Sequence, residues 1–292
     1  MDKQTIKKSL DIPVLFIIFN RPQTTAKVFE SIRKVKPERL FIAGDGPRNN
    51  KSEDKQLCSD ARNITKQIDW PCKVKTLFQE KNLGCGHGVS TAINWFFDNV
   101  EYGIILEDDC LPNESFYYYC QELLEYYKNN NKIMHISGNN FQYGKKRGNS
   151  SYYFSEYTHI WGWATWKRAW NYYDFNCISP EKRYSSWDKQ WLISVNKNNG
   201  LSILPNVNLV SNIGFGNEAT HTPTITEYSN LPTYPIIFPL IHPKVIRINL
   251  SADLMTHRKM FNGNNIGFLI QKLLRVIPEP IKKTTKYIMN KI

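Results

Sequence analysis

The first half of the chain alternates short, apolar runs rich in β-formers with longer segments in which apolar residues recur every three or four positions. Short apolar runs are typical of buried strands, and the recurring pattern is typical of amphipathic helices. We expect strands at 12–19, 39–45, 73–79 and 102–108, followed in turn by helices at 23–35, 52–67, 89–98 and 114–128. This alternation predicts an α/β, Rossmann-like fold with a mostly parallel sheet and helices on both faces.

The second half of the chain has a different pattern. One more strand is expected at 132–138, and aromatic-dense segments follow it at 151–155, 159–175 and 185–191. No linker of biased composition separates the two halves. We therefore expect one domain over residues 1–263 and a basic, amphipathic helical tail at 264–292, which prolines split at 278 and 280.

The charge of the chain favours an anionic partner. The formal net charge is +12, and the tail carries six basic residues against one acidic residue. Such an excess suits nucleic acid, an acidic membrane surface or a phosphate-bearing substrate, and charge alone does not choose among them. The tail is a candidate anchor to an anionic membrane surface.

No segment predicts export or membrane insertion. The apolar run 12–19 contains Pro13 and is followed by no small-residue cleavage site, so it is interpreted as a strand and not as a signal sequence. The six cysteines form no C-x-x-C pair, which argues against structural zinc and favours reduced thiols. We expect a cytoplasmic protein, either soluble or peripheral at the inner face of the membrane.

The sharpest chemical feature is the acidic triplet Glu107, Asp108 and Asp109, which directly follows the apolar residues 104–106. Adjacent carboxylates at the end of a buried strand repel one another unless a cation or hydrogen-bond donors compensate them. A divalent ion such as Mg²⁺ or Mn²⁺ would do so, because one or two carboxylates with phosphate and water complete its shell. The alternative is a solvated acidic turn in which Asp109 or Asn113 caps the next helix.

Two other predicted strand ends carry polar groups. Arg21 follows the first strand, and Asp45 follows the second within "AGDGPRN". Ligands of parallel sheets bind beyond the carboxyl ends of the strands, so a carboxylate there could accept the N–H of a pyrimidine base and an arginine could meet a base or a phosphate. Taken singly, each residue could equally belong to an ordinary turn.

The order of these segments resembles the GT-A glycosyltransferases. It runs through an "NR" turn, a "GD" turn, the "NLGCGHGV" loop and helix, and "GIILEDDCLPNESFYYY". The resemblance is most specific to N-acetylglucosaminyltransferase I and its bacterial relatives of the nucleotide-diphospho-sugar transferase superfamily. It implies that Asp109 binds Mn²⁺ or Mg²⁺, that Asp108 contacts the ribose and Glu107 the transferred sugar, and that Arg21 and Asp45 contact the nucleoside.

The resemblance continues in scattered blocks to about residue 222. "SSWDKQWLI" is similar to a Trp-Asp segment that carries the catalytic base, which implies that role for Asp188. Here the family's second acidic residue is replaced by Lys189, and the alternative is that Asp188 caps a helix beginning at Lys189. His87 matches a base-contacting histidine with an offset of about one position.

Two further blocks belong to this resemblance. "NLVSNIGFGNEATHT" is similar to a loop that closes over the bound donor and that here contains Gly214, Phe215 and Gly216. "WGWATWKRAW" is similar to a segment that precedes the acceptor region. Aromatic side chains of both Trp-containing segments could stack on sugars, although such density is also typical of a core. The acceptor-side candidates are Trp161, Trp163 and Trp187.

The resemblance implies a metal-dependent, inverting glycosyltransferase, with a donor half at about 12–138 and an acceptor half at about 139–263. It would move a hexose or N-acetylhexosamine from a nucleotide-diphospho-sugar, expected to be UDP-linked, to a glycan or lipid-linked hydroxyl in surface polysaccharide or lipopolysaccharide biosynthesis. No nucleic-acid partner is expected. One alternative is a sugar-nucleotide pyrophosphorylase, against which "FNRPQTT" lacks a glycine-rich phosphate loop. Another is a non-catalytic protein that binds a membrane surface.

Overall fold

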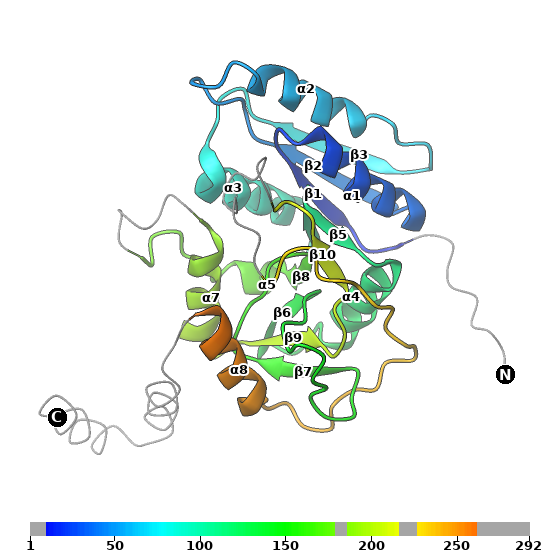
Figure 1. Ribbon diagram of the computed structural model, residues 1–292, viewed down its shortest axis with the longest axis vertical. Helices are drawn as coiled ribbons and strands as arrows, with labels where there is room; N and C mark the ends of the chain where they lie inside the picture. Colours follow the sequence, from blue (N-terminus) through cyan, green and yellow to red (C-terminus); the bar gives the residue numbers. More distant parts are fainter. Residues whose placement is uncertain (1–9, 179–185, 216–226, 262–292) are drawn as a thin grey trace, which may run out of the picture. The chain divides into compact units, whose positions relative to one another are not determined.

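A computed structural model describes residues 10–178, 186–215 and 227–261. Within these ranges eight strands form one mixed sheet in the order β3-β2-β1-β4-β8-β6-β9-β7 (Figure 1). The strands are β1 Val14–Ile18, β2 Arg39–Gly44, β3 Lys73–Phe78, β4 Tyr102–Glu107, β6 Ile133–Ser137, β7 Tyr152–Ser155, β8 Trp163–Trp166 and β9 Leu201–Pro205.

The first four of these strands are parallel to one another, as expected. β1 lies between β2 and β4, and β3 lies on the outer side of β2. The connections between them are helical: α1 Pro22–Val35, α2 Asp54–Ile64 and α3 Gly84–Asn99, with α4 Glu114–Tyr126 after β4. The predicted α/β fold with a mostly parallel sheet is confirmed.

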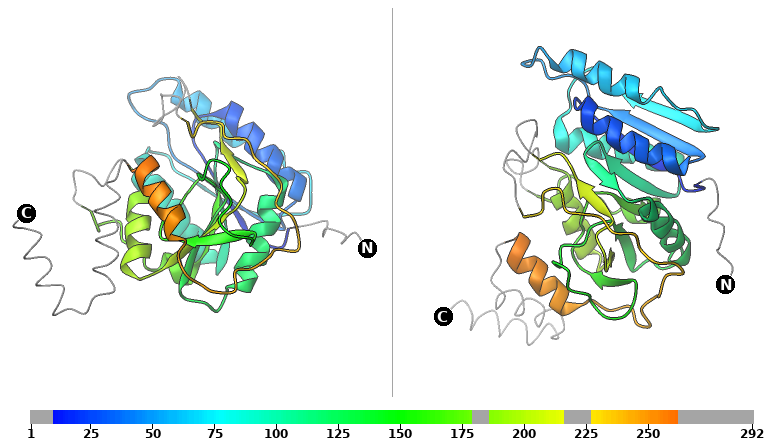
Figure 2. Two further views of the ribbon diagram at one scale, coloured as in Figure 1. Left: turned by 60° about the horizontal axis from the view of Figure 1, so that its bottom comes forward. Right: turned by 45° about the vertical axis from the view of Figure 1, so that its right-hand side comes forward.

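Side chains of β1 alternate between the two faces of the sheet because successive residues of a strand point in opposite directions. Phe16 and Ile18 pack with α1, α2 and α4, whereas Leu15 and Ile17 pack with α3 and with two later helices, α5 Lys167–Trp170 and α7 Asp188–Lys197. Figure 2 shows helices on both sides of the sheet. All five residues of β1 are buried, which explains the continuous apolar run in the sequence.

The aromatic-rich half extends the same sheet. β8 is antiparallel to both of its neighbours, β4 and β6, and β9 is parallel to β6. A second, two-stranded sheet joins β5 Cys110–Pro112 to β10 Val210–Asn212 in antiparallel register. This small sheet brings the segment after β10 beside the acidic triplet, where the N–H of Ile213 donates to the carbonyl of Asp109 at 2.8 Å.

Helix α3 begins five residues before the expected start at 89. Glycines at 84, 86 and 88 are poor helix formers, so the sequence pattern there is that of a loop. The structure compensates with Asp45, whose carboxylate accepts the backbone N–H groups of Leu83 and Gly84 at 2.9–3.1 Å. The helix therefore starts where a distant side chain caps it.

The chain divides into two compact units, Met1–Ile248 and Asn249–Ile292. In the second unit the described part contains one helix, α8 Leu250–Met260. The tail expected at 264–292 lies outside the described residues, and the boundary at 263/264 stays a prediction. Among the helices that the structure describes, none has both the length and the apolar character needed to cross a bilayer.

Candidate functional site

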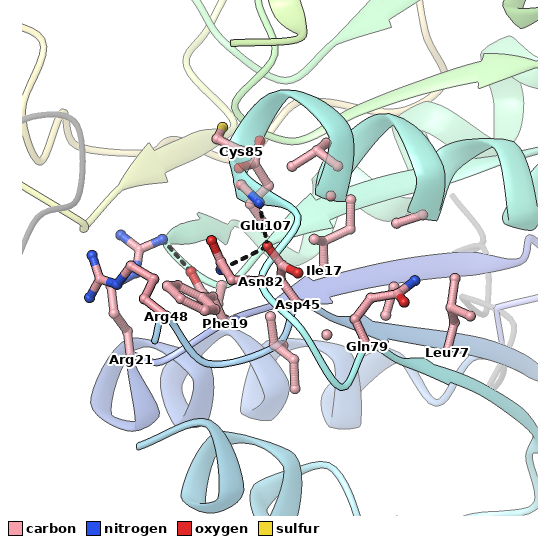
Figure 3. A pocket seen from close by; sticks show the side chains of 18 residues that line it. Ile17, Phe19, Arg21, Asp45, Arg48, Leu77, Gln79, Asn82, Cys85 and Glu107 are labelled. Atoms are coloured by element: carbon pink, nitrogen blue, oxygen red, sulfur yellow. Dashed lines mark hydrogen bonds and ion pairs between the residues drawn. The ribbon is translucent and has the colours of Figure 1, made fainter. Parts of the chain in front are cut away.

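The carboxyl ends of the parallel strands surround a cavity of about 340 Å³ (Figure 3). Its apolar floor comes from β1 to β3 and from α3: Ile17, Ala43, Leu77, Val89 and Ala92. Its polar wall comes mainly from strand ends and the loops after them: Arg21, Asp45, Arg48, Gln79, Asn82, Glu107 and Asp108. The cavity thus has the apolar lining and the few convergent polar groups that are typical of a small-molecule site.

Arg21 compensates two carboxylates of the acidic triplet. Its Nη1 donates to Oδ2 of Asp109 at 2.9 Å, and its Nη2 donates to Oδ1 of Asp108. Asp108 also accepts the N–H of Phe19 at 2.9 Å. Burial works against the charge of Arg21, but Asp108 and Asp109 outweigh it and raise the pKa of the guanidinium. The sequence analysis expected a cation or hydrogen-bond donors to offset the repulsion within the triplet. The guanidinium group of Arg21 provides positive charge and N–H donors together.

Glu107 keeps no ion-pair partner of this kind among the described residues. Burial raises the pKa of its carboxyl to about 8, and the charges of Asp109 and Asp108 add to the rise. Arg21 only partly opposes it. Glu107 is therefore a carboxyl group in the cavity wall that holds its proton well above the usual range and can donate a hydrogen bond.

The donor set near Asp109 fits a divalent ion held by a single protein carboxylate. The side chain is 14% exposed, and among the described residues its Oδ1 accepts only the weak thiol donor of Cys110, at 3.4 Å. Within the described ranges, no group of three or more His, Cys, Asp or Glu residues is arranged to hold a metal. Such a site would suit Mg²⁺ or Mn²⁺ whose other ligands are phosphate oxygens and water.

The carboxylate of Asp45 lies in the cavity wall, but its lone pairs are largely engaged. It accepts N–H groups from Gly46, Leu83 and Gly84 and the side-chain amide of Asn82, at 2.8–3.1 Å. Burial raises the pKa of Asp45, and the three backbone N–H groups oppose the rise. The arrangement fixes the start of α3 at the cavity. The expected contact between Asp45 and a nucleoside stays a prediction.

Gly214 lies directly against the ion pair of Arg21 and Asp109. A Cβ atom at position 214 would be 2.4 Å from Oδ2 of Asp109 and 2.7 Å from Nη1 of Arg21. The next residue, Phe215, packs edge to face with Trp161, with ring centroids 5.6 Å apart. The predicted donor-closing loop thus reaches the triplet at its described end, and Gly216 lies outside the described residues.

Asp188 is the first residue of α7. The helix does not begin at Lys189, and the residue at its N-cap position is Trp187, which makes no side-chain capping bond. The alternative in which Asp188 caps the helix is therefore wrong. Burial is the main cause of the raised pKa of Glu107 and of the Cys85 thiol, and the charge of Asp188 adds to both. Asp188 does not line the cavity, and its role as base stays a prediction.

The tryptophan candidates separate into core and surface. Trp163 and Trp187 are 0% and 2% exposed, with ring centroids 5.5 Å apart in a cluster of buried aromatic residues, so neither ring has a face left for a sugar. Because both side chains are buried, the expected acceptor role of Trp163 and Trp187 is wrong. Trp161 is partly buried beside Phe141 and Phe215 and remains a candidate.

His87 lies on the first turns of α3 and is exposed, but it does not line the cavity. Its ring packs against that of Phe175, with centroids 4.1 Å apart. The structure therefore brings Arg21, Asp45, Glu107 and Asp108 into the cavity wall and leaves His87 outside it. Its contact with a base stays a prediction.

Several cavity residues were missed by the sequence reasoning. Gln79 and Asn82 follow β3, and Arg48 lies three residues after Asp45 in the loop after β2. Arg48 is held by the fully buried Asp54 at the start of α2. These residues could have been found from their position in the sequence, because each follows the end of a predicted strand. An arginine in a turn is otherwise interpreted as an ordinary solvated residue.

No family model matches the chain, and no curated protein matches it. Similar solved structures exist at low identity, and three of them are described here. A UDP-glucose pyrophosphorylase complexed with UDP-glucose is 10% identical, with a TM-score of 0.38 over 67% of this chain and 91% of that chain. The inositol-1-phosphate CTP transferase from T. maritima is 8% identical, with a TM-score of 0.38 over 67% and 85%. HddC from Yersinia pseudotuberculosis is 9% identical, with a TM-score of 0.31 over 54% and 77%.

By name, the first two of these structures agree with the expected alternative, a sugar-nucleotide pyrophosphorylase, and none of the three is named as a glycosyltransferase. Likeness at these identities and TM-scores carries no inference about the reaction. The resemblance to GT-A glycosyltransferases therefore stays a proposal, and the structure itself establishes a Rossmann-like α/β fold with a cavity at the carboxyl ends of its parallel strands.

Proposed function

We propose that the chain is an enzyme that uses nucleotide-diphospho-sugars and, more specifically, a metal-dependent inverting glycosyltransferase. The observation that carries this proposal is the cavity at the ends of β1 to β4, which joins an apolar floor to Arg21 and the acidic triplet. An apolar slot suits a nucleobase, and the neighbouring guanidinium and carboxylates suit a diphosphate and its counter-ion.

Arg21 and Asp109 have separate roles in this proposal. Nε of Arg21 is buried and has no hydrogen-bond partner among the described residues, and this unsatisfied donor is assigned to a phosphate oxygen of the ligand. Asp109 would hold Mg²⁺ or Mn²⁺, which neutralises negative charge on the leaving diphosphate. Asp108 and Glu107 are assigned to hydroxyl groups of the ribose and the sugar.

Asp188 is the proposed general base. Its carboxylate accepts the proton of an acceptor hydroxyl as the hydroxyl oxygen bonds to the anomeric carbon. The bond from that carbon to the diphosphate breaks on the opposite side, and the electron pair leaves with the nucleoside diphosphate. The acceptor is proposed to be a glycan or a lipid-linked saccharide. General-base catalysis of this kind contributes about 10²- to 10⁴-fold in rate.

The alternative reaction is nucleotidyl transfer, in which pyrophosphate attacks a nucleotide-sugar. A glycine-rich phosphate loop after the first strand would favour it. The connection from β1 to α1 is instead Phe19-Asn20-Arg21, and α1 starts at once with Pro22. This connection offers an arginine side chain in place of a cradle of glycine N–H groups, which supports the glycosyltransferase over the pyrophosphorylase.

Product analysis separates the two reactions. The protein is first screened by thermal shift against UDP-, GDP-, CMP- and dTDP-sugars with and without Mn²⁺, since a donor at 100 times its Kd stabilises by about 2.7 kcal/mol. The stabilising donor is then incubated with and without pyrophosphate. Without pyrophosphate, we expect release of the nucleoside diphosphate as the sugar passes to an added saccharide acceptor or, more slowly, to water. Formation of a nucleoside triphosphate and a sugar 1-phosphate would establish the alternative instead.

Substitutions test the assigned residues. Asp188→Asn should lower the transfer rate by about 10²- to 10⁴-fold and leave donor affinity unchanged, because only the base is lost. Asp109→Ala should remove the metal dependence of donor binding. Asp98→Asn, on the exposed end of α3, is the matched control and should match wild type in both assays. Near-normal turnover in Asp188→Asn would exclude this residue as the base.

A further inference from the structure

Arg48 is held in one orientation at the wall of the cavity. Its Nε and Nη2 donate to the two carboxylate oxygens of Asp54 at 2.6 and 2.9 Å, and its backbone N–H donates to Oδ2 at 3.1 Å. Asp54 is 0% exposed and also accepts the amide of Asn20 at 2.7 Å. A two-pronged pair of this kind fixes the plane of the guanidinium group.

The fixed guanidinium leaves one nitrogen unused. Nη1 of Arg48 has no hydrogen-bond partner among the described residues, and the aromatic ring of Phe19 lies beside the guanidinium at 5.5 Å. A purely structural arginine of the same chain differs. Arg168 uses Nε, Nη1 and Nη2 on four backbone carbonyls. Among the described residues, Arg168 thus uses four of its five N–H donors, whereas Arg48 uses two of five and keeps three at the cavity wall.

Arg21 and Arg48 lie at the same end of the cavity, with Phe19 beside them, and Leu77 and Gln79 lie at the other end (Figure 3). Both nitrogens that Arg21 turns toward the carboxylates are engaged, and its Nε is the one without a partner. One end of the cavity thus holds two guanidinium groups with unused donors. The other end offers apolar side chains and an amide, which suit a flat nucleobase.

We propose that Arg48 and Arg21 form a clamp for the diphosphate of the nucleotide donor, and that buried Asp54 is the residue that positions Arg48. The inference rests on the proposed function, because it assigns the anionic part of the same ligand to this end of the cavity. Guanidinium groups bind phosphate oxygens through parallel N–H donors, and a group already held in place loses less entropy on binding.

Arg33 provides a matched control. Its guanidinium lies over the ring of Phe29 at 5.2 Å and pairs with Glu30 at 2.8 Å, so its local chemistry resembles that of Arg48. It does not line the cavity. A substitution of Arg33 therefore removes an arginine and its aromatic and acidic contacts without removing the proposed clamp.

The test is calorimetric binding of UDP, uridine and inorganic pyrophosphate at one fixed excess of Mg²⁺. Arg48→Met is combined with Asp54→Asn, so that no unpaired carboxylate is left buried. We expect this double variant to bind UDP and pyrophosphate about ten- to a hundredfold more weakly, the usual effect of a lost charged hydrogen bond. Uridine affinity should stay within about twofold, and it reports that the cavity is intact. Arg33→Met should match wild type for all three ligands.

Asp54→Asn alone tests positioning. It keeps the charge of Arg48 but removes one of its two anchors, so UDP and pyrophosphate should bind about three- to tenfold more weakly while uridine does not change. A purely structural role would weaken all three ligands alike.

Four outcomes overturn the clamp. Equal loss of uridine and UDP affinity in the double variant, with pyrophosphate affinity unchanged, would assign Arg48 to the base, and equal loss for all three ligands would assign it a structural role. Unchanged UDP affinity there would exclude Arg48 from the site and leave the proposed function standing. If no nucleoside diphosphate binds to wild type, the proposed function fails and the clamp fails with it.

Discussion

At the scale of single residues, Arg21 supplies part of the positive charge that the sequence leaves to a metal ion. The three carboxylates are adjacent in the sequence, so their repulsion could be inferred directly. Their partner could not be, because Arg21 precedes Asp109 by 88 positions and reaches it only when β1 and β4 lie side by side. The same holds for Gly214, whose missing Cβ matters only because Asp109 and Arg21 pack against it.

Two buried histidines make the fold sensitive to acid. Nδ1 of His135 accepts a hydrogen bond from Trp191 at 3.1 Å, so its Nε2 carries the proton and donates to the carbonyl of His159 at 2.9 Å. A second proton on Nδ1 would face the indole N–H. Burial lowers the pKa of both His135 and His159 to about 3.

These low pKa values set the direction of the pH dependence. Between about pH 6.5 and 3 the unfolded chain binds protons that the folded chain does not, so the free energy of unfolding falls as the pH falls. At pH 5 each histidine should cost about 2 kcal/mol relative to pH 7. Buried Glu107, whose pKa is raised to about 8, gains stability over the same pH range, so the histidine effect is measured as a difference between wild type and His159→Asn. In urea unfolding at the two pH values, His159→Asn should lose about 2 kcal/mol less than wild type from pH 7 to pH 5. The same pH dependence in both proteins would contradict the prediction.

At the scale of elements, the sequence predicted the four strand-helix pairs well because β1, β2 and β4 are short and almost wholly buried and each helix has one apolar face. The fourth strand, β3, is mostly exposed. The sequence could not predict the direction of β8, because parallel and antiparallel buried strands carry the same apolar pattern. The sequence also did not predict the start of α3. Three glycines make its first turn resemble a loop, and the capping carboxylate of Asp45 lies 39 positions before Gly84.

The cap on α3 should be measurable. In Asp45→Asn one carboxylate oxygen becomes an amide donor that faces the N–H groups of Leu83 and Gly84, so the variant should lose about 1–2 kcal/mol of unfolding free energy. Urea unfolding without ligand tests this. Asp98→Asn changes an exposed carboxylate on the same helix and is expected to stay within about 0.5 kcal/mol of wild type. Equal losses in the two variants would exclude a specific cap.

At the scale of the whole molecule, composition and charge limited the possible partners but did not select one. The fold explains where an anionic ligand would enter the first unit, at a cavity with two guanidinium groups. The cavity does not account for the positive charge of the tail, whose six basic residues and one acidic residue lie beyond the described part of the chain. We propose that the tail brings the protein to an anionic membrane surface on the cytoplasmic side.

Deletion of residues 264–292 tests the tail. Each basic residue near an anionic bilayer contributes about 1 kcal/mol, so removal of the tail should lower binding to phosphatidylserine-containing vesicles at least tenfold. Co-sedimentation measures the effect, with phosphatidylcholine vesicles as the neutral control. Sugar transfer to a soluble acceptor should persist in the shortened protein. If deletion does not change co-sedimentation, the proposal that the tail is the membrane anchor is wrong.

Six of the eight tryptophans are buried, and Trp95, which is part of α3, is partly buried and packs against Phe41. Trp161 is different, because its partly buried indole touches Phe215, the neighbour of the glycine that lies against Asp109. Indole emission responds to the polarity around the ring. The protein therefore carries an intrinsic fluorophore at the edge of its proposed reaction centre. The Trp161→Phe variant lacks this indole alone, so the difference between its emission and that of wild type reports ligand binding without an attached dye.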